Sequence, residues 1–381
     1  MTHQPEKHDI IVIGAGIAGA SVAAELASQA HVLLLEREDR PGYHTTGRSA
    51  ALFTIAYGPP VIRALSRASH GFFRNPGSPF IGQPLLKERG VIFAAHEGQL
   101  AVLEDLAEEL GDAVRPLTRE AALSMMPLIR PDYLAGALID ASAADIDVDA
   151  LHQHYLKTFQ AHGGTLRTKV EVTSIAREDG GWTVEAGGER FHAATVVNAA
   201  GAWADEIAAM AGVAPVGLVP KRRTALLIDP PAGHEPDRPN LWPMVVDAEE
   251  GFYIKPDAGL LLISPADETP SPPCDAQPEE LDIAICVDRI ETAFDIPVRR
   301  IAHKWAGLRS FVADKCPVIG FAPDAEGFFW LAGQGGYGIQ SAPAAARAAA
   351  ALVLKQPLPE DIAAEGVTAE ALSPARKGIG Q

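Results

Sequence analysis

Three glycines and one acidic residue near the start of the chain have the types and the spacing for binding a dinucleotide. Gly14, Gly16 and Gly19 form the pattern G-x-G-x-x-G, and Glu36 stands 20 residues beyond Gly16. Glycines at this spacing allow a tight turn, a close approach of the backbone to a pyrophosphate, and close helix–strand packing. The acidic side chain can accept hydrogen bonds from a ribose. These residues therefore predict a dinucleotide site.

The elements that must position these residues are also readable. An apolar strand, Ile10 to Ile13, precedes the glycines, a small-residue helix follows them, and a second apolar strand, His31 to Leu35, ends at Glu36. This is a βαβ unit, in which the pyrophosphate lies at the helix N-terminus, here at Ile17 and Ala18. The context makes the motif much more specific than the glycine pattern alone.

The composition limits the class of protein. The chain has 381 residues, is 47% hydrophobic and has a net charge of −17, which predicts about two domains and argues against nucleic acid or an anionic membrane as partner. Three widely spaced cysteines indicate a reducing compartment. The polar N-terminus, MTHQPEKH, lacks the features of a secretory leader. We expect a cytoplasmic protein with no integral membrane segment.

Three later segments are also rich in small residues that would let the backbone approach a cofactor closely. Residues 41–51 (PGYHTTGRSAA) predict a turn and then a helix beginning at Arg48 and Ser49, a second anion site on the flavin side of a cofactor. TVVNAAGAW predicts a strand and a small-residue turn before a helix from Trp203. The strand Phe328 to Ala332 leads into a glycine-rich turn and an alanine-rich helix. No second complete glycine fingerprint is present, so we expect one dinucleotide.

The remaining chain predicts mixed structure, with amphipathic helix in residues 61–73 and strand in residues 90–95. The helix over residues 98–110 should bury Leu100, Leu103, Leu106 and Leu110, and Asp147 or Asp149 should cap the next helix. Short strands follow in residues 165–176, 182–186 and 190–198, and residues 220–309 form a second β-rich layer. The fold class is α/β (α+β), with a Rossmann-like domain and a segmented, β-rich substrate domain. The histidines at 152 and 154 do not share a helix face, and no metal site is expected.

The motifs together resemble the FAD-dependent D-amino acid oxidase/dehydrogenase superfamily, and most closely the bacterial D-arginine dehydrogenases. The resemblance rests on residues 41–65 and on the strings ADIDVDALHQHYL, NAAGAWADEIA, LVPKRR, FYIKPDAG, KWAGLRSFVAD and EGFFWLAGQGGYGIQ. It implies an FAD-binding domain of residues 1–52, 141–218 and 310–381, and a substrate-binding domain of residues 53–140 and 219–309.

The implied reaction is the oxidative deamination of a D-amino acid. Its α-hydrogen passes as hydride to flavin N5, water hydrolyses the imino acid to a 2-oxo acid and ammonia, and the electrons go to an acceptor other than oxygen. A quinone acceptor would allow loose membrane contact. FAD is expected to be bound non-covalently; attachment through Cys316 is the less favoured reading.

The resemblance also assigns residues to the site. Arg223, Arg309 and Tyr253 would hold the substrate carboxylate, Tyr57 and Thr54 would line the side-chain pocket, and Gly336 would contact the substrate beside the flavin. Leu52, Val91 and Gln340 complete the predicted pocket. Predicted cofactor contacts are Gly14, Gly16, Ile17, Ala18, Gly19, Glu36, Arg37, Gly47, Arg48, Ser49, Ala50, Val170, Ala200, Gly201, Trp203, Gly335, Gly336, Tyr337, Gly338, Ile339 and Gln340.

Two departures from the resembled sequences change the expected substrate. They have a histidine where this chain has Leu52, and a glutamate that recognises the substrate guanidinium where this chain has Val91. Without that carboxylate a cationic side chain has no charge partner, so we expect a preference for neutral or apolar D-amino acids. Glu88 could replace the glutamate only if the alignment shifted by three residues, which reverses the face of a strand.

Four other readings stay open. The chain could be a D-arginine dehydrogenase proper or an oxygen-reducing oxidase of glycine, sarcosine or a cyclic imino acid. It could act on 2-hydroxy acids. It could also be a flavin-binding subunit that has no turnover of its own.

Overall fold

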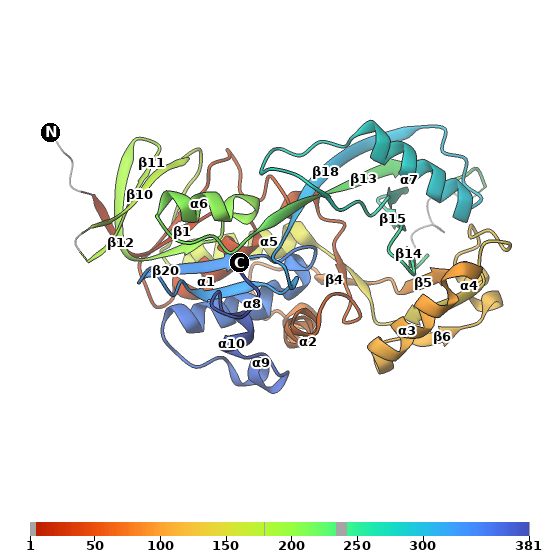
Figure 1. Ribbon diagram of the computed structural model, residues 1–381, viewed down its shortest axis with the longest axis horizontal. Helices are drawn as coiled ribbons and strands as arrows, with labels where there is room; N and C mark the ends of the chain where they lie inside the picture. The colour runs from red at the N-terminus through yellow and green to blue at the C-terminus, as the bar shows by residue number, and fades with distance from the viewer. Residues whose placement is uncertain (1–4, 179, 234–241, 381) are drawn as a thin grey trace.

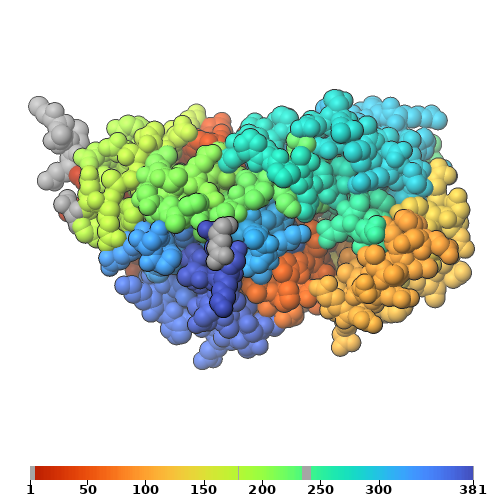
Figure 2. Space-filling view, in the orientation of Figure 1, coloured from red at the N-terminus to blue at the C-terminus, as the bar shows by residue number. Residues whose placement is uncertain are grey.

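A computed structural model describes residues 5–178, 180–233 and 242–380 (Figure 1). Two large sheets lie at opposite ends of an elongated molecule, and the chain passes between them several times. In the space-filling view, green and dark-blue segments occupy one end of the molecule, and orange, yellow, teal and light-blue segments make up the other (Figure 2). Among the described residues no helix has the length and apolar character needed to cross a membrane.

The first sheet carries the predicted βαβ unit. Five of its strands are parallel, in the order β9, β2, β1, β12, β20, and the β10–β11 hairpin and β19 add antiparallel strands. Its strands are β1 (Glu6–Ile13), β2 (Val32–Leu35), β9 (Thr165–Arg167), β10 (Val172–Glu178), β11 (Gly181–Ala186), β12 (Glu189–Asn198), β19 (Val318–Phe321) and β20 (Phe328–Ala332).

Helices cover both faces of this sheet because alternate strand residues point to opposite sides. Ile10 and Val12 of β1 pack with α1 (Ile17–Leu26), α5 (Val148–Ala161) and α8 (Gly338–Val353). Ile11 and Ile13 face α6 (Ala204–Met210) and the β10–β11 hairpin on the other side. The alanine-rich α8 is almost wholly buried, since small side chains let α1 and α2 (Pro60–Arg74) lie close to it. Two short helices, α9 (Glu360–Ala364) and α10 (Ala369–Leu372), follow.

The second sheet is antiparallel except where β14 pairs with β5. Its strands are β5 (Val91–Ala95), β6 (Arg115–Leu117), β7 (Gly136–Asp140), β13 (Val219–Ile228), β14 (Met244–Asp247), β15 (Tyr253–Asp257), β16 (Leu260–Ser264), β17 (Thr269–Pro270) and β18 (Ile301–Phe311). One face packs on α7 (Glu280–Ala293) and α4 (Arg119–Met125), and the other on α3 (Leu100–Leu110). A small third sheet contains β3 (Leu52–Phe53), β4 (Leu86–Glu88) and β8 (Ala144–Ile146).

The strand segments suggest where the domains divide. The first sheet draws its strands from residues 1–52, 141–218 and 310–381, and the second from residues 53–140 and 219–309, except that β18 continues past this boundary to Phe311. We therefore propose two segmented domains with these boundaries. Helix α2 is an exception to the predicted boundary, because it lies in the sequence of the substrate domain but packs against α8 beneath the first sheet.

Three local predictions were wrong. No α-helix begins at Arg48 and Ser49: a single 3₁₀ turn ends at Arg48, Ser49 is extended, and the next α-helix is α2. Leu100 is 37% exposed because it lies at the first turn of α3, so the buried stripe is shorter than its spacing suggested. The strand expected over residues 165–176 is two strands, β9 and β10, separated by Lys169 in a left-handed conformation.

Three buried histidines give the stability of the protein a pH dependence. His8, His152 and His154 are at most 8% exposed, and burial lowers the pKa of each below its usual 6.5. Below about pH 6.5 the unfolded chain therefore binds protons that the native protein does not, and stability is lost as pH falls. Each histidine that stays neutral contributes up to about 1.4 kcal/mol per pH unit to this loss.

We expect the urea midpoint of the FAD-loaded protein to fall as the pH is lowered from about 7 to about 5.5, a window above the range where ordinary carboxyl groups titrate. His154→Asn should flatten the slope, whereas substitution of the exposed His303 by asparagine should not. A midpoint that is constant or that rises over this window would contradict the assignment of neutral buried histidines.

Candidate active site

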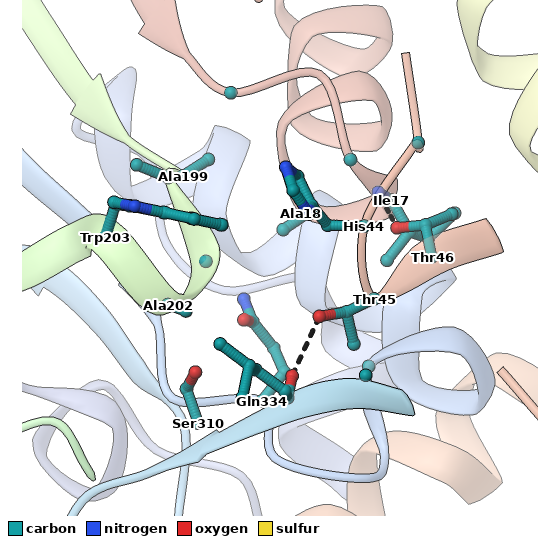
Figure 3. A pocket seen from close by; sticks show the side chains of 18 of the residues that line it. Ile17, Ala18, His44, Thr45, Thr46, Ala199, Ala202, Trp203, Ser310 and Gln334 are labelled. Atoms are coloured by element: carbon teal, nitrogen blue, oxygen red, sulfur yellow. Dashed lines mark hydrogen bonds between the residues drawn. The ribbon is translucent and has the colours of Figure 1, made fainter. Parts of the chain in front are cut away.

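A large cavity lies between the two sheets, and its walls come from segments far apart in the sequence. Figure 3 shows part of it, with Trp203 and His44 on its sides and the side chain of Gln334 extending into it. The described residues that line it are Ile13, Gly14, Gly16, Ile17, Ala18, Leu35, Glu36, Arg37, Gly42, Tyr43, His44, Thr45, Thr46, Arg48, Ser49, Ala50, Val170, Glu171, Val172, Ala199, Ala200, Gly201, Ala202, Trp203, Glu206, Ile207, Met210, Arg223, Ala225, Tyr253, Gly307, Leu308, Arg309, Ser310, Gly333, Gln334, Gly335, Gly336, Gly338 and Ile339.

One end of the cavity is built around the glycine loop between β1 and α1. Gly14 has φ +97°, and a Cβ there would lie 2.6 Å from the carbonyl oxygen of Ala199, so both conformation and space require glycine. A Cβ at Gly19 would lie 1.8 Å from the carbonyl oxygen of Gly14. The loop is held by Glu36, which accepts a hydrogen bond of 2.9 Å from the backbone N–H of Ala15. The turn, the close packing and the acidic residue are thus arranged as the motif predicts.

The segment from residue 42 to 49 forms another wall of the same end. Thr46 accepts a 2.9 Å hydrogen bond from the backbone N–H of Ile17 in the first turn of α1. His44 is hydrogen-bonded to Glu38 at 2.8 Å, and its ring lies 4.7 Å from that of Trp203 between centroids. The guanidinium of Arg37 lies over the ring of Trp203, 4.4 Å from the ring centroid. These contacts fix the side walls of the cavity around the helix N-terminus.

The other end carries two arginines on neighbouring strands. In the antiparallel pair β13–β18, Arg223 lies opposite Gly307, so Arg309, two residues farther along β18, is its diagonal neighbour on the same face of the sheet. The residue opposite Arg223 is a glycine, and the stem of Arg48 packs over it, with Cβ of Arg48 3.5 Å from where a Cβ at Gly307 would lie. Both guanidinium groups therefore face one end of the cavity, and planar guanidinium groups are suited to binding a carboxylate through two hydrogen bonds.

The charge balance at this end favours an anion. Lys221 and Arg223 share one carboxylate, Glu268, at 2.8 Å and 3.3 Å. Arg223 is 7% exposed, and its Nε has no hydrogen-bond partner among the described residues. Arg309 forms no ion pair within the described part of the chain; it donates a 3.2 Å hydrogen bond to the Tyr57 hydroxyl. Two guanidinium groups thus retain donors that a bound carboxylate can use.

Tyrosines and a glycine complete this end. A Cβ at Gly336 would lie 2.8 Å from Nη1 of Arg309, so the glycine lets the arginine side chain pack closely against the loop after β20. The ring of Tyr57 packs edge-on against Tyr337, and burial raises the pKa of the Tyr57 hydroxyl, although Arg309 acts in the opposite direction. Tyr253 on β15 is 6% exposed and lines the cavity. Tyr57 therefore stays a neutral hydroxyl at ordinary pH.

Leu52 and Val91 belong to an apolar cluster that includes Tyr253 and lies on the inner face of the second sheet. Val91 is 1% exposed, and neither it nor Leu52 lines the cavity directly. Glu88 lies elsewhere: its side chain is 85% exposed, and its nearest basic partner is Arg74, at 3.9 Å. The structure therefore places no carboxylate from Glu88 at the cavity.

Thr54 and Gln340 lie behind the cavity wall rather than on it. Thr54 donates to Asp140 at 2.6 Å, and its backbone N–H donates to the Gln340 side chain at 3.3 Å. The amide of Gln340 donates in turn to Ser66 at 2.9 Å. Both residues are 3% exposed, and together they connect α8 with the segment after β3 and with the end of β7.

Most of the sequence-predicted site residues meet at the cavity, and eight do not line it. The eight are Gly19, Gly47, Leu52, Thr54, Tyr57, Val91, Tyr337 and Gln340; each is near the cavity through a contact described above or, for Gly47, through a backbone hydrogen bond to Gly42. Residues that sequence analysis missed include Thr45, Thr46, Ser310 and Gln334. The polar pair in HTTGR was a usable signal, since hydroxyl groups beside glycines suit an anion site.

The comparisons with known proteins agree with this geometry. Residues 9–352 match the family model of the FAD dependent oxidoreductases known as DAO. Glycine oxidase of Geobacillus kaustophilus is 26% identical over 389 aligned residues, covering 97% of this chain and 98% of the relative, and glycerol 3-phosphate dehydrogenase of Caloramator mitchellensis is 26% identical, covering 88% and 72%. The crystal structure of that glycine oxidase superposes with a TM-score of 0.79 at 25% identity, covering 96% and 99%.

A second solved structure, L-proline dehydrogenase from P. horikoshii, superposes with a TM-score of 0.77 at 22% identity over 97% of this chain and 98% of that one. At this identity the likeness concerns the fold. The glycine loop, the N-terminus of α1 and the glycine-rich turn after β20 all line the cavity, and the free backbone N–H groups of a helix N-terminus suit the pyrophosphate of FAD. The chain therefore belongs to the DAO family of FAD-dependent oxidoreductases, and its cofactor is FAD.

Proposed function

We propose that the protein is an FAD-dependent D-amino acid dehydrogenase that prefers neutral or apolar side chains. The observation that carries this proposal is the pair Arg223 and Arg309, which face one end of the cavity with unused donors. A carboxylate bound there would leave the rest of the substrate inside the cavity that the cofactor end also lines. The chemistry that FAD supplies when bound is acceptance of a hydride from that α-carbon.

The protein's own contribution would be to bind and orient the substrate. Arg223 and Arg309 hold the carboxylate, the neutral Tyr57 hydroxyl keeps Arg309 in place, and Tyr253 closes the pocket from β15. Because Leu52 stands where the resembled sequences have histidine, no histidine side chain from that position assists the amine, and solvent would deprotonate it. The imino acid released is hydrolysed by water to a 2-oxo acid and ammonia.

The apolar cluster of Leu52, Val91 and Tyr253 supports the preference in side chain. Of the three only Tyr253 lines the cavity, and Leu52 and Val91 pack behind it, so an aliphatic or aromatic side chain next to Tyr253 removes apolar surface from water, whereas a guanidinium there would lose hydration. The exposed position of Glu88 supports the same choice over a D-arginine dehydrogenase proper.

The bound FAD would be non-covalent. Cys316 does not line the cavity, and burial raises the pKa of its thiol, so the nucleophilic thiolate is disfavoured. We propose that the electrons leave to an acceptor other than oxygen, a quinone being one candidate. The glycine oxidase relative supports the alternative, an amine oxidase that reduces oxygen.

Anaerobic mixing with a panel of substrates tests this function. D-leucine, D-methionine and D-phenylalanine should bleach the flavin absorption at rates at least about tenfold above D-arginine, since one unpaired charge in the pocket costs more than 1.4 kcal/mol. The L-isomers should be inactive, and colour should return slowly when air is admitted. The panel also includes glycine, sarcosine, D-lactate and glycerol 3-phosphate.

Each other pattern points elsewhere. Rapid recovery in air with peroxide formation would identify the oxidase, and bleaching chiefly by D-arginine would refute the apolar preference. Bleaching by a hydroxy acid alone would refute amine chemistry, and bleaching by none of these compounds would favour a flavin-binding subunit.

A further inference from the structure

Arg48 lies in the loop that lines the cofactor end of the cavity, yet its guanidinium is directed to the strand that carries Arg309. Nη1 donates to the carbonyl oxygens of Ala306 at 2.9 Å and Ala276 at 3.1 Å, and Nη2 pairs with Asp275. The backbone carbonyl of Arg48 accepts a 3.0 Å hydrogen bond from the indole of Trp305. All its guanidinium contacts that the structure shows are to protein groups outside the glycine loop.

These bonds belong to a regular series along one edge of β18. The other edge of the strand pairs with β13, and on the free edge the carbonyls of Ala306, Leu308 and Ser310 accept hydrogen bonds from Arg48, Thr45 and the backbone of Gly335, respectively. The Thr45 bond measures 2.7 Å and is visible in Figure 3. Two loops that line the cofactor end thus replace the missing neighbouring strand.

The stem and the outer end of Arg48 are fixed as well. A Cβ at Gly307 would lie 3.5 Å from Cβ of Arg48, so the side chain packs directly over the glycine that faces Arg223. The guanidinium lies 5.2 Å from the centroid of Tyr43, and the Arg48 side chain is 14% exposed. A group that is this well buried and bonded has little freedom to move.

We propose that Arg48 is a positioning residue that fixes the β18 strand, and with it Arg309, relative to the cofactor end of the cavity. The proposal rests on the proposed function in that Arg309 is taken to bind the substrate carboxylate. It differs from the role expected from sequence, direct contact with the cofactor. Lysine cannot replace Arg48 fully, because only a guanidinium can reach two carbonyl groups and a carboxylate in fixed directions.

Arg48→Met keeps the apolar stem and removes the charged donors, and it should raise the KM for D-leucine about 10- to 100-fold, the range for losing charged hydrogen bonds. The rate of flavin bleaching at saturating D-leucine should change less than about threefold, and FAD should remain bound with nearly unchanged affinity. The affinity for 2-oxo-4-methylpentanoate, followed as a shift of the flavin spectrum, should fall by the same factor as KM rises. The KM of Arg48→Lys should lie between those of the wild type and Arg48→Met.

A double-mutant comparison separates positioning from general loss of structure. In an Arg309→Lys background, Arg48→Met should add less than about threefold to KM, because residues that act through each other are not additive. Arg300→Met is the control: it removes an exposed ion pair with Asp229 and should change neither KM nor ligand affinity. Thr45→Val should raise KM in the same direction as Arg48→Met but less, which keeps the test usable where Arg48→Met does not fold.

The outcomes divide clearly. Loss of FAD from Arg48→Met with an unchanged KM in the reloaded enzyme would show a direct cofactor role and overturn the proposal, as would full additivity with Arg309→Lys. A wild type that binds the 2-oxo acid but is bleached by no D-amino acid would refute the proposed function while leaving the positioning role measurable by ligand affinity. A wild type that does neither would refute both.

Discussion

Substituting Arg309 by methionine is expected to lower kcat/KM for a D-amino acid by about 10³-fold, close to 4 kcal/mol, mainly through KM. Removing one member of a buried, hydrogen-bonded charge pair costs 2–5 kcal/mol or more, and Arg309 has no carboxylate of its own within the described chain. Its charge is therefore available to the substrate carboxylate. Arg309→Lys keeps the charge but loses the bidentate geometry. Its kcat/KM should lie between those of the wild type and Arg309→Met.

Steady-state kinetics with D-leucine and direct binding of 2-oxo-4-methylpentanoate measure this effect. Arg300→Met serves as the control, because Arg300 is a 63% exposed side chain in an ion pair with Asp229 and exposed pairs contribute little. An Arg309→Met enzyme that kept its KM within threefold would place the carboxylate elsewhere in the cavity.

Substituting Gly14 by alanine is expected to yield protein without FAD. The added Cβ would lie 2.6 Å from the carbonyl oxygen of Ala199, and a left-handed conformation at φ +97° is unfavourable for alanine. Relief requires the glycine loop or the turn after β12 to move, and both of these line the cofactor end of the cavity. We expect an FAD affinity reduced by at least about 100-fold, measured by titration of the apoprotein with FAD fluorescence.

Gly212→Ala separates the effect of the collision from the effect of the backbone strain. Gly212 also has a positive φ, +69°, but a Cβ there meets nothing within 4 Å, so it carries the backbone strain without the collision. It should lower thermal stability slightly and leave FAD binding unchanged. If both variants lost FAD equally, general destabilisation would explain the result, and circular dichroism of the apoproteins would show it.

The elements around the glycine loop were predictable because local chemistry determines them. The β1–α1–β2 unit, an aspartate cap for α5 and the β20–α8 turn follow from apolar runs bounded by glycine or a capping residue; the structure confirms them and shows that Asp147, of the two candidates, is the cap. The segment after Gly47 was mispredicted because small residues there favour helix only when nothing competes. Thr45 and Arg48 instead bond to β18, 258 positions away in the case of Arg48, and the chain between them forms a single 3₁₀ turn that ends at Arg48.

The site was less predictable because it depends on strand register. Nothing in the spacing of Arg223 and Arg309 indicates that they are diagonal neighbours; that follows from pairing Arg223 with Gly307 across β13 and β18. The roles of Thr54 and Gln340 illustrate the same limit, since their direct hydrogen bond joins residues 286 positions apart. The resemblance named these residues, whereas only the folded chain shows what each one touches.

The separation of the two arginines from the apolar cluster has a consequence for how such a protein can diversify. The arginines stand on β13 and β18, whereas Leu52, Val91 and Tyr253 stand on β3, β5 and β15. Under the proposed function, the carboxylate that all amino acids share is bound from β13 and β18, whereas the side chain that distinguishes them lies toward β3, β5 and β15. Substitutions around this apolar cluster can then alter the accepted side chain without disturbing the arginines that bind the carboxylate, so related enzymes can change specificity in few steps while the reaction stays the same.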